Sequence, residues 1–146
     1  MVVLDWSAFM NQTDMLSNII LQTEWKPDML IAVARGGWIL TRMLSDSLGV
    51  KEMASIGITY RDTERTKLDV YSMPEIKIVK AKLLLIDDRL ESATSLKYAK
   101  EILTSLGHDV KTACLFTHSK NIIVPDFQLE KIDDEVIFPW ELERKG

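Results

Sequence analysis

Short apolar runs along this chain alternate with stretches in which hydrophobic residues recur with a helical period. Met29 to Ala34 is apolar throughout and is followed by a glycine turn, which is typical of a strand buried on both faces of a sheet. The expected strands are Met29 to Ala34, Ser55 to Tyr60, Lys82 to Asp88 and Val110 to Phe116, with shorter ones at Leu68 to Tyr71, Ile76 to Val79 and Glu135 to Trp140. The expected helices are Asp5 to Thr23, Trp38 to Leu48 and Ala93 to Leu106. This alternation predicts a three-layer α/β/α domain with a mostly parallel sheet.

The bulk composition fits one globular domain. The chain has 146 residues, of which 47% are hydrophobic and 27% charged, and we expect residues 1–146 to form a single domain. The net charge is −4 and the basic residues are scattered, which argues against a nucleic-acid partner. No apolar run approaches the roughly 18 residues of a membrane helix, and the N-terminus does not resemble a signal peptide. With a single cysteine, Cys114, in an apolar run, we expect a soluble cytoplasmic protein without a membrane partner.

The end of the strand Lys82 to Asp88 carries residues suited to a sugar phosphate. Asp87 and Asp88 would suit vicinal hydroxyls or a hydrated Mg²⁺ ion. The small and hydroxylic segment Ser92 to Ser95 opens the next helix, where free backbone N–H groups and the helix dipole favour a phosphate. Alternatively, the hydroxyls only cap the helix and the acids only favour its dipole.

A second strand end carries Ala34-Arg35-Gly36-Gly37. The glycines allow the backbone to approach a ligand closely, and Arg35 adds a planar fork for phosphate oxygens. Because ligands of parallel sheets lie beyond the carboxyl ends of the strands, we expect the two loops to act together.

These two loops resemble those of the type I phosphoribosyltransferases, which take the ribosyl group from phosphoribosyl pyrophosphate (PRPP). Asp87 to Ser95 is similar to the PRPP loop of that family, and Ala34 to Gly37 to its pyrophosphate loop. The resemblance covers nearly the whole chain and is closest to the short xanthine–guanine and hypoxanthine (6-oxopurine) branch. The segments similar to that branch are Lys26 to Asp28, Val124 to Phe127 and Ile137 to Glu141.

The resemblance implies a Mg²⁺-dependent enzyme of purine salvage that transfers the phosphoribosyl group to a purine or purine-like base and releases pyrophosphate. Its ligands would be PRPP, a nucleobase and a nucleoside monophosphate, and the chain would form a homodimer or homotetramer. Glu91 stands where the family has the acid that handles the proton of the base, and Asp88 would lie closest to the metal. The residues implied to be catalytic are Glu91, Asp87 and Asp88. Those implied to bind PRPP are Arg35, Gly36, Asp87, Asp88, Glu91, Ser92, Ala93, Thr94 and Ser95.

Two further regions would complete such a site. A mobile hood loop is expected near residues 60–75, with Tyr60, Arg61, Arg65 and Lys67, although a solvated charged hairpin explains the same charges. A base-side segment is expected near 118–141. There, His118 falls on the family's purine-binding lysine and Glu135 on its stacking tryptophan. The residues expected to contact the base are His118, Lys120, Val136 and Ile137.

The departures from the family pattern support a second hypothesis. Ser92-Ala93 replaces the usual Thr-Gly, and Arg89 replaces an apolar residue. The chain would then be a protein of the phosphoribosyltransferase fold that binds a nucleotide or PRPP, or acts in regulation, with weak or no catalysis. A phosphoacceptor receiver domain is a third hypothesis, but its paired acids should come near the chain start rather than at 87 and 88.

Overall fold

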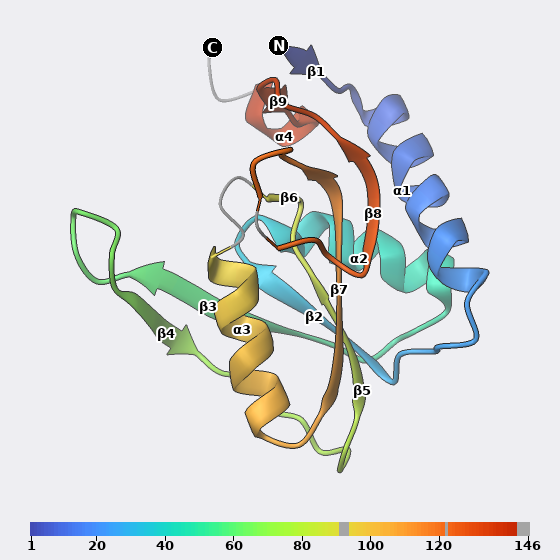
Figure 1. Cartoon of the computed structure of the whole chain (residues 1–146). Coiled ribbons are helices and arrows are strands. Elements are labelled where there is room, and N and C mark those ends of the chain that lie inside the picture. Colours follow the sequence, from blue (N-terminus) through green and yellow to red (C-terminus); the bar gives the residue numbers. More distant parts are fainter. Residues whose placement is uncertain (91–93, 122, 143–146) are drawn as a thin grey trace.

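A computed structural model describes residues 1–90, 94–121 and 123–142 of the chain (Figure 1). The strands are β1 (Val2–Val3), β2 (Met29–Ala34), β3 (Met53–Tyr60), β4 (Leu68–Ser72), β5 (Lys82–Ile86), β6 (Arg89–Leu90), β7 (Asp109–Thr117), β8 (Phe127–Lys131) and β9 (Val136–Ile137). The helices are α1 (Trp6–Leu21), α2 (Gly37–Leu48), α3 (Thr94–Ser105) and α4 (Pro139–Leu142).

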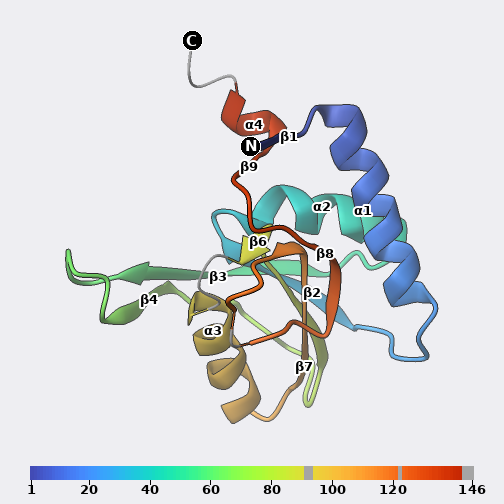
Figure 2. The ribbon, with the colours of Figure 1, turned by 45° about the horizontal axis from the view of Figure 1, so that its top comes forward.

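The central sheet has the order β4-β3-β2-β5-β7-β6, and β8 also pairs with β7. Its pairs are parallel except for β3 with β4, which form an antiparallel hairpin. Helices α1 and α2 cover one face of the sheet, and α3 covers the other (Figures 1 and 2). The expected three-layer α/β fold with a mostly parallel sheet is therefore confirmed.

The neighbouring strands β2 and β5 are apolar, apart from Lys82 at the start of β5, because they contribute to a core on each face. Along β5, Leu84 and Ile86 pack in the core under α1 and α2, whereas Leu83 and Leu85 pack in the core under α3. This assignment follows from the two-residue period of a strand, which sends successive side chains to opposite faces. The continuous run that predicted a doubly covered strand thus has a direct structural cause.

The helix ends follow the chemistry of their flanking residues. The carboxylate of Asp5 accepts a hydrogen bond from the backbone N–H of Ala8 at 2.7 Å and caps the start of α1. Gly49, with φ of 69°, ends α2 in the left-handed conformation that glycine adopts at low cost. Cys114 is buried in the core, and burial raises the pKa of its thiol, so it packs as a small hydrophobe.

Three segments differ from the sequence-based expectations. The prediction of a strand at Ile76 to Val79 is wrong, because this segment pairs with no strand and the side chain of Val79 is 85% exposed. Phe127–Lys131 forms the edge strand β8, which was not expected. Its alternation of apolar and polar residues is too short to be recognised in the sequence. The strand expected at Glu135 to Trp140 is shorter: β9 holds Val136–Ile137 and pairs with β1, and Pro139 opens α4.

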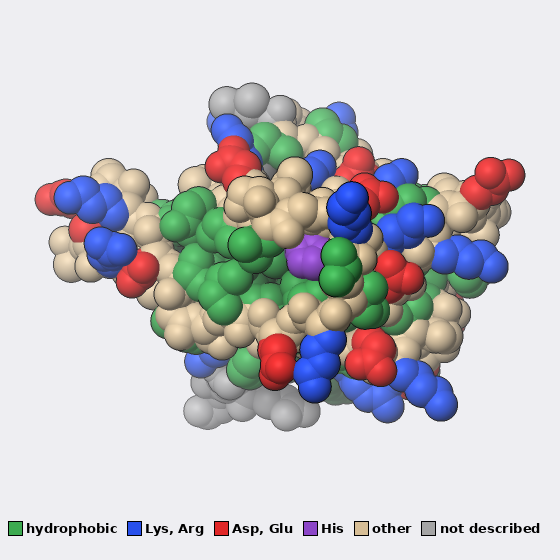
Figure 3. All heavy atoms as spheres, turned by 90° about the horizontal axis from the view of Figure 1, so that it is seen from below, with side chains coloured by type: hydrophobic (Ala, Val, Ile, Leu, Met, Phe, Trp, Pro, Cys, Tyr) green, Lys and Arg blue, Asp and Glu red, His purple; other side chains and the backbone are tan. Residues whose placement is uncertain are grey.

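The face below the amino ends of β5 and β7 carries a patch of hydrophobic side chains with charged side chains around it (Figure 3). Exposed hydrophobic side chains next to these strand starts include those of Ile78, Val79 and Leu106. This face is at the end of the strands opposite to Asp87 and Asp88 (Figure 1). Within the described residues, no helix is both long and apolar enough to cross a membrane.

Candidate active site

The loops after β2 and β5 come together at the carboxyl end of the sheet. The two strands are parallel neighbours, with Ala32 paired to Ile86, so their following loops leave the sheet at the same edge. A Cβ atom on Gly36 would lie 2.9 Å from Oδ1 of Asp88, and one on Gly37 would overlap the carbonyl oxygen of Ile86. Glycine at both positions therefore lets the first loop lie directly against the paired acids.

The two acids are held by backbone contacts and are costly to ionise. Oδ1 of Asp87 accepts a hydrogen bond from the N–H of Asp88 at 2.9 Å, and Oδ1 of Asp88 accepts one from the N–H of Arg89 at 2.7 Å. Burial raises the pKa of Asp88 to about 6. Burial, and then the neighbouring charge of Asp88, raise the pKa of Asp87 well above its ordinary value. A cation bound here would offset this cost.

This donor set fits Mg²⁺. Within the part of the chain that the structure describes, no group of three or more His, Cys, Asp or Glu side chains could hold a metal ion. Mg²⁺ usually takes only one or two protein carboxylates and completes its coordination with water and substrate phosphates. The adjacent carboxylates of Asp87 and Asp88 meet that requirement.

A pocket of about 540 Å³ lies beside the acids, and we call it the acidic pocket. It is lined by Arg35, Gly36, Trp38, Ile39, Asp88, Arg89, Trp140 and Glu141. Of these, Arg35, Gly36 and Asp88 were expected as site residues, and the other five were not. The ring of Trp140 also stacks on Phe138, at 4.7 Å between centroids. Trp140 and Glu141 belong to α4, and their position beside the acids depends on where that helix packs, which no local motif encodes.

A second pocket, of about 400 Å³, lies on the other side of Arg89, and we call it the His118 pocket. It is lined by Arg89, Leu90, Phe116, Thr117, His118, Lys120, Ile132, Asp133, Asp134, Glu135 and Val136. Three of the residues expected to contact the base, His118, Lys120 and Val136, are thus brought together. The fourth, Ile137, is buried and pairs with β1 instead of lining this pocket.

The ring of His118 has a defined hydrogen-bonding pattern. Its Nδ1 accepts a hydrogen bond from the backbone N–H of Lys120 at 3.1 Å. The same Nδ1 lies 3.5 Å from Oδ1 of Asp133. When Nδ1 accepts the bond from Lys120, the ring proton is on Nε2, which is then a hydrogen-bond donor. His118, Lys120 and Arg89 together give the His118 pocket three groups able to donate to a carbonyl oxygen.

The expected hood residues belong to the β3–β4 hairpin, which projects from the body of the molecule (Figures 1 and 2). At its tip, Oδ1 of Asp62 accepts hydrogen bonds from the backbone N–H groups of Thr66 and Lys67 at 2.9 and 3.0 Å. Arg61 pairs with Asp69, and the guanidinium of Arg65 lies 4.7 Å from the ring centroid of Tyr60. Tyr60, Arg61, Arg65 and Lys67 line neither the acidic pocket nor the His118 pocket.

The expected phosphate turn is described only in part. Glu91, Ser92 and Ala93 lie outside the described residues. Thr94 and Ser95 form the first turn of α3, and the acids Asp87 and Asp88 precede this turn by a few residues.

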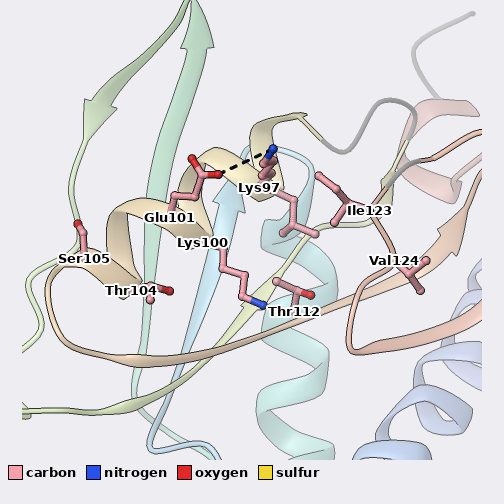
Figure 4. Close-up of a pocket in the computed structure, with 9 residues that line it drawn as sticks. Lys97, Lys100, Glu101, Thr104, Ser105, Thr112, Ile123 and Val124 are labelled. Carbon is pink, nitrogen blue, oxygen red and sulfur yellow. Dashed lines mark ion pairs between the residues drawn. The ribbon is translucent and has the colours of Figure 1, made fainter.

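Another hollow, of about 540 Å³, lies away from these residues (Figure 4). It is formed by the outer face of α3, by Thr112 of β7 and by the segment Ile123–Val124. Its two lysines are paired, Lys97 with Glu101 and Lys100 with Asp126. None of the expected site residues lines it.

A glycine loop packed against two acids lies at the carboxyl ends of neighbouring central strands, the edge at which parallel α/β sheets bind their ligands. The family model of the phosphoribosyl transferase domain matches residues 3–145. The chain belongs to this family and has the type I phosphoribosyltransferase fold.

Solved structures agree with this assignment. The chain is similar to the purine phosphoribosyltransferase of Pyrococcus horikoshii, with 26% identity over 96% of this chain and 93% of that one, and a TM-score of 0.85. It is also similar to the xanthine-guanine-hypoxanthine phosphoribosyltransferase of Helicobacter pylori, with 26% identity over 99% and 96% of the two chains and a TM-score of 0.88. A hypothetical protein from Neisseria gonorrhoeae with bound ppGpp shares the fold at 20% identity, covering 96% and 88% of the chains with a TM-score of 0.84.

Proposed function

We propose that this protein transfers the 5-phosphoribosyl group of PRPP to a purine or purine-like base, with Mg²⁺ as cofactor and pyrophosphate as the second product. The observation that carries the proposal is the contact between two loops: the backbone of Gly36 lies against the carboxylate of Asp88, at the edge where α/β sheets bind ligands. The family supports PRPP chemistry, and the similar proteins of P. horikoshii and H. pylori support a purine as the acceptor.

The leaving group and the sugar would bind on the acidic side. Arg35 and the N–H groups of the glycine loop would hold pyrophosphate, and Asp87 and Asp88 would face the ribose hydroxyls. Bound Mg²⁺ would be held through Asp88 and would neutralise charge on the departing pyrophosphate. The N–H groups and hydroxyls of Ser92 to Ser95 would bind the 5′-phosphate at the start of α3.

The base would bind in the His118 pocket. Nε2 of His118 and the ammonium of Lys120 are donors suited to a carbonyl oxygen of the ring. Glu91 would take the proton that the attacking ring nitrogen releases. The transition state has oxocarbenium character, so closure of the β3–β4 hairpin over the site would help by excluding water. A homodimer or homotetramer in the cytoplasm completes the proposal.

A specific observation also favours the second candidate, a nucleotide- or PRPP-binding protein with weak catalysis. Glu135 is exposed and lines the His118 pocket at the position where the family has an aromatic ring. A carboxylate cannot stack on a purine, so the base would be held more weakly than the sugar phosphate.

One assay separates the candidates. Purified protein is incubated with PRPP, Mg²⁺ and each of hypoxanthine, guanine, xanthine and adenine, and nucleotide and pyrophosphate are quantified. We expect at least one base to give both products in equal amounts, with no reaction when Mg²⁺ is chelated. Binding of PRPP or a nucleotide, measured by calorimetry and without turnover, would support the second candidate. Absence of both turnover and binding would refute both candidates.

A further inference from the structure

Arg89 occupies a special place between the two pockets. It is the only residue common to the described linings of the acidic pocket and the His118 pocket. It follows Asp88 directly, its backbone N–H donates to Oδ1 of that acid at 2.7 Å, and it pairs with Phe116 of β7. Its backbone is therefore fixed with respect to the acid expected to face the ribose.

The side chain of Arg89 joins this position to the C-terminal segment 136–141. Its Nη1 donates a hydrogen bond to the carbonyl oxygen of Val136, and its Nη2 lies 3.1 Å from Oε1 of Glu141. The guanidinium carbon is 5.5 Å from the ring centroid of Phe138. The side chain of Arg89 is only 29% exposed, so these contacts are partly shielded from water.

Glu141 extends the connection into the backbone of the same segment. While Oε1 faces Arg89, Oε2 accepts a hydrogen bond from the N–H of Phe138 at 3.0 Å. The guanidinium fork thus reaches the segment at two places, Val136 directly and Phe138 through Glu141. A lysine could not reproduce both contacts, because its ammonium is a single point rather than a planar fork.

The segment has little other regular backbone pairing. Strand β9 consists of only two residues, and its described partner is β1, which also has only two residues and lies outside the central sheet. The central strands β2 and β5, in contrast, are each paired on both sides. The contacts of Arg89 therefore connect this segment to β6, a two-residue strand that pairs with β7 and directly follows Asp88.

We propose that Arg89 is a positioning residue that sets the distance between the base and the ribosyl carbon. The inference rests on the proposed function, because Val136 lines the pocket assigned to the base and Asp88 faces the sugar. Transfer requires the ring nitrogen to approach the ribosyl carbon to about 3 to 3.5 Å while pyrophosphate leaves on the other side. By holding the segment 136–141 against the residue after Asp88, Arg89 fixes that approach without contacting the reacting atoms.

The test compares the Michaelis constants of the two substrates in four variants. Arg89→Leu removes the fork, Arg89→Lys keeps the charge, and Glu141→Gln weakens the second contact. Arg42→Leu is the matched control, because it breaks an arginine–carboxylate pair with Asp46 on the exposed surface of α2.

For Arg89→Leu we expect a rise of about tenfold in the KM of the base and a fall of about tenfold in kcat, because a small misplacement of a reactant is enough for such losses. Arg89 also lines the acidic pocket, but the KM of PRPP should rise by a smaller factor than that of the base, since Gly36 and Asp88 keep their backbone positions. Glu141→Gln should act in the same direction with a smaller effect, Arg89→Lys should recover part of the loss, and Arg42→Leu should match the wild type.

The inference would be overturned if Arg89→Leu changed the KM of the base and the KM of PRPP by the same factor, or if it behaved like Arg42→Leu. In both cases, turnover by the wild type would still support the proposed function. If Arg89→Leu fails to fold, as judged by circular dichroism, Glu141→Gln decides in the same way. If the wild type binds its ligands without turnover, the test compares dissociation constants. Arg89→Leu must then weaken the binding of a purine nucleoside monophosphate more than the binding of PRPP. A wild type that binds neither refutes the proposed function and this inference with it.

Discussion

The acidic pocket and the His118 pocket are built by different means. On the acidic side, Gly36 and Asp88 follow central strands that are hydrogen-bonded on both sides, so backbone geometry fixes the site. On the other side, β7 supplies Phe116 and Thr117, but the wall at Val136 is held by the side chain of Arg89 and by the two-residue pairing of β1 with β9. Departures from the family pattern occur on both sides, at Ser92-Ala93 and Arg89 next to the acids and at His118 and Glu135 in the other pocket. The two sides therefore differ in how they are built, and this difference can be tested.

The largest effect should come from Asp88→Asn. If Asp88 holds Mg²⁺ and faces the ribose, this change should weaken Mg²⁺-dependent PRPP binding about 1000-fold, because a metal ion contributes several kcal/mol to such a site. Isothermal titration calorimetry with PRPP, with and without Mg²⁺, measures this. Asp46→Asn, on the exposed side of α2, is the control. Unchanged PRPP affinity in Asp88→Asn would place the metal and the ribose elsewhere.

The rigidity of the acidic side can be tested with Gly37→Ala. Alanine normally favours a helix, but here its Cβ would overlap the carbonyl oxygen of Ile86, so we expect a loss of about 3 kcal/mol in the free energy of unfolding. Denaturant unfolding measures it. Gly107→Ala is the control, because a Cβ there meets no atom within 4 Å and costs about 1 kcal/mol through its positive φ alone. Equal losses in both variants would mean that the two loops are less tightly packed than described.

The buried acids also predict a pH dependence. The pKa of Asp88 is raised by burial to about 6, so the folded state holds a proton that the unfolded state releases near pH 4. In metal-free protein, this group therefore stabilises the fold below about pH 4, and its contribution falls by roughly 2 to 3 kcal/mol as pH rises to about 6. The raised pKa of Asp87 acts in the same direction.

The measurement is the difference in unfolding free energy between Asp88→Asn and the wild type across this pH range, without Mg²⁺. The variant should become the more stable of the two as the pH rises. A difference that does not change with pH would contradict the burial of this carboxyl group.

The smallest effect should come from Glu135→Trp, which adds an aromatic side chain to the wall of the His118 pocket. We expect a gain of about 1 kcal/mol in base binding, or roughly a fivefold lower KM, because stacking of aromatic rings contributes about this much. The KM of PRPP should not change. Glu24→Trp, at an exposed position beyond the end of α1, is the control. A rise in the base KM would mean that Glu135 itself contacts the substrate.

The sequence predicted the central sheet better than its periphery. Met29 to Ala34 has the predicted bounds because a run of six apolar residues between turns is too short for a helix and suits a buried strand. The same reasoning failed at Ile76 to Val79, a shorter run interrupted by Lys77, which has no strand partner and is exposed at Ile78 and Val79. It also missed β8, because a short edge strand of mixed polarity has no strong local signal.

The candidate site shows the same division. Asp87, Asp88 and the loop at Arg35 and Gly36 could be found because their motifs lie at strand ends, and a parallel sheet brings such ends together. The wall formed by Arg89 could not be foreseen, because its partners Val136 and Glu141 are 47 and 52 residues away in the sequence. Contacts of that range depend on the final packing of α4 and β9, which local patterns do not encode.

The most direct test is a crystal structure of the protein with PRPP and Mg²⁺ in the absence of a base. We expect the pyrophosphate group of PRPP to lie against Arg35 and Gly36, and its ribose hydroxyls to lie against Asp87 and Asp88. Electron density for PRPP in the hollow of Figure 4, or an empty acidic pocket at saturating PRPP, would contradict it.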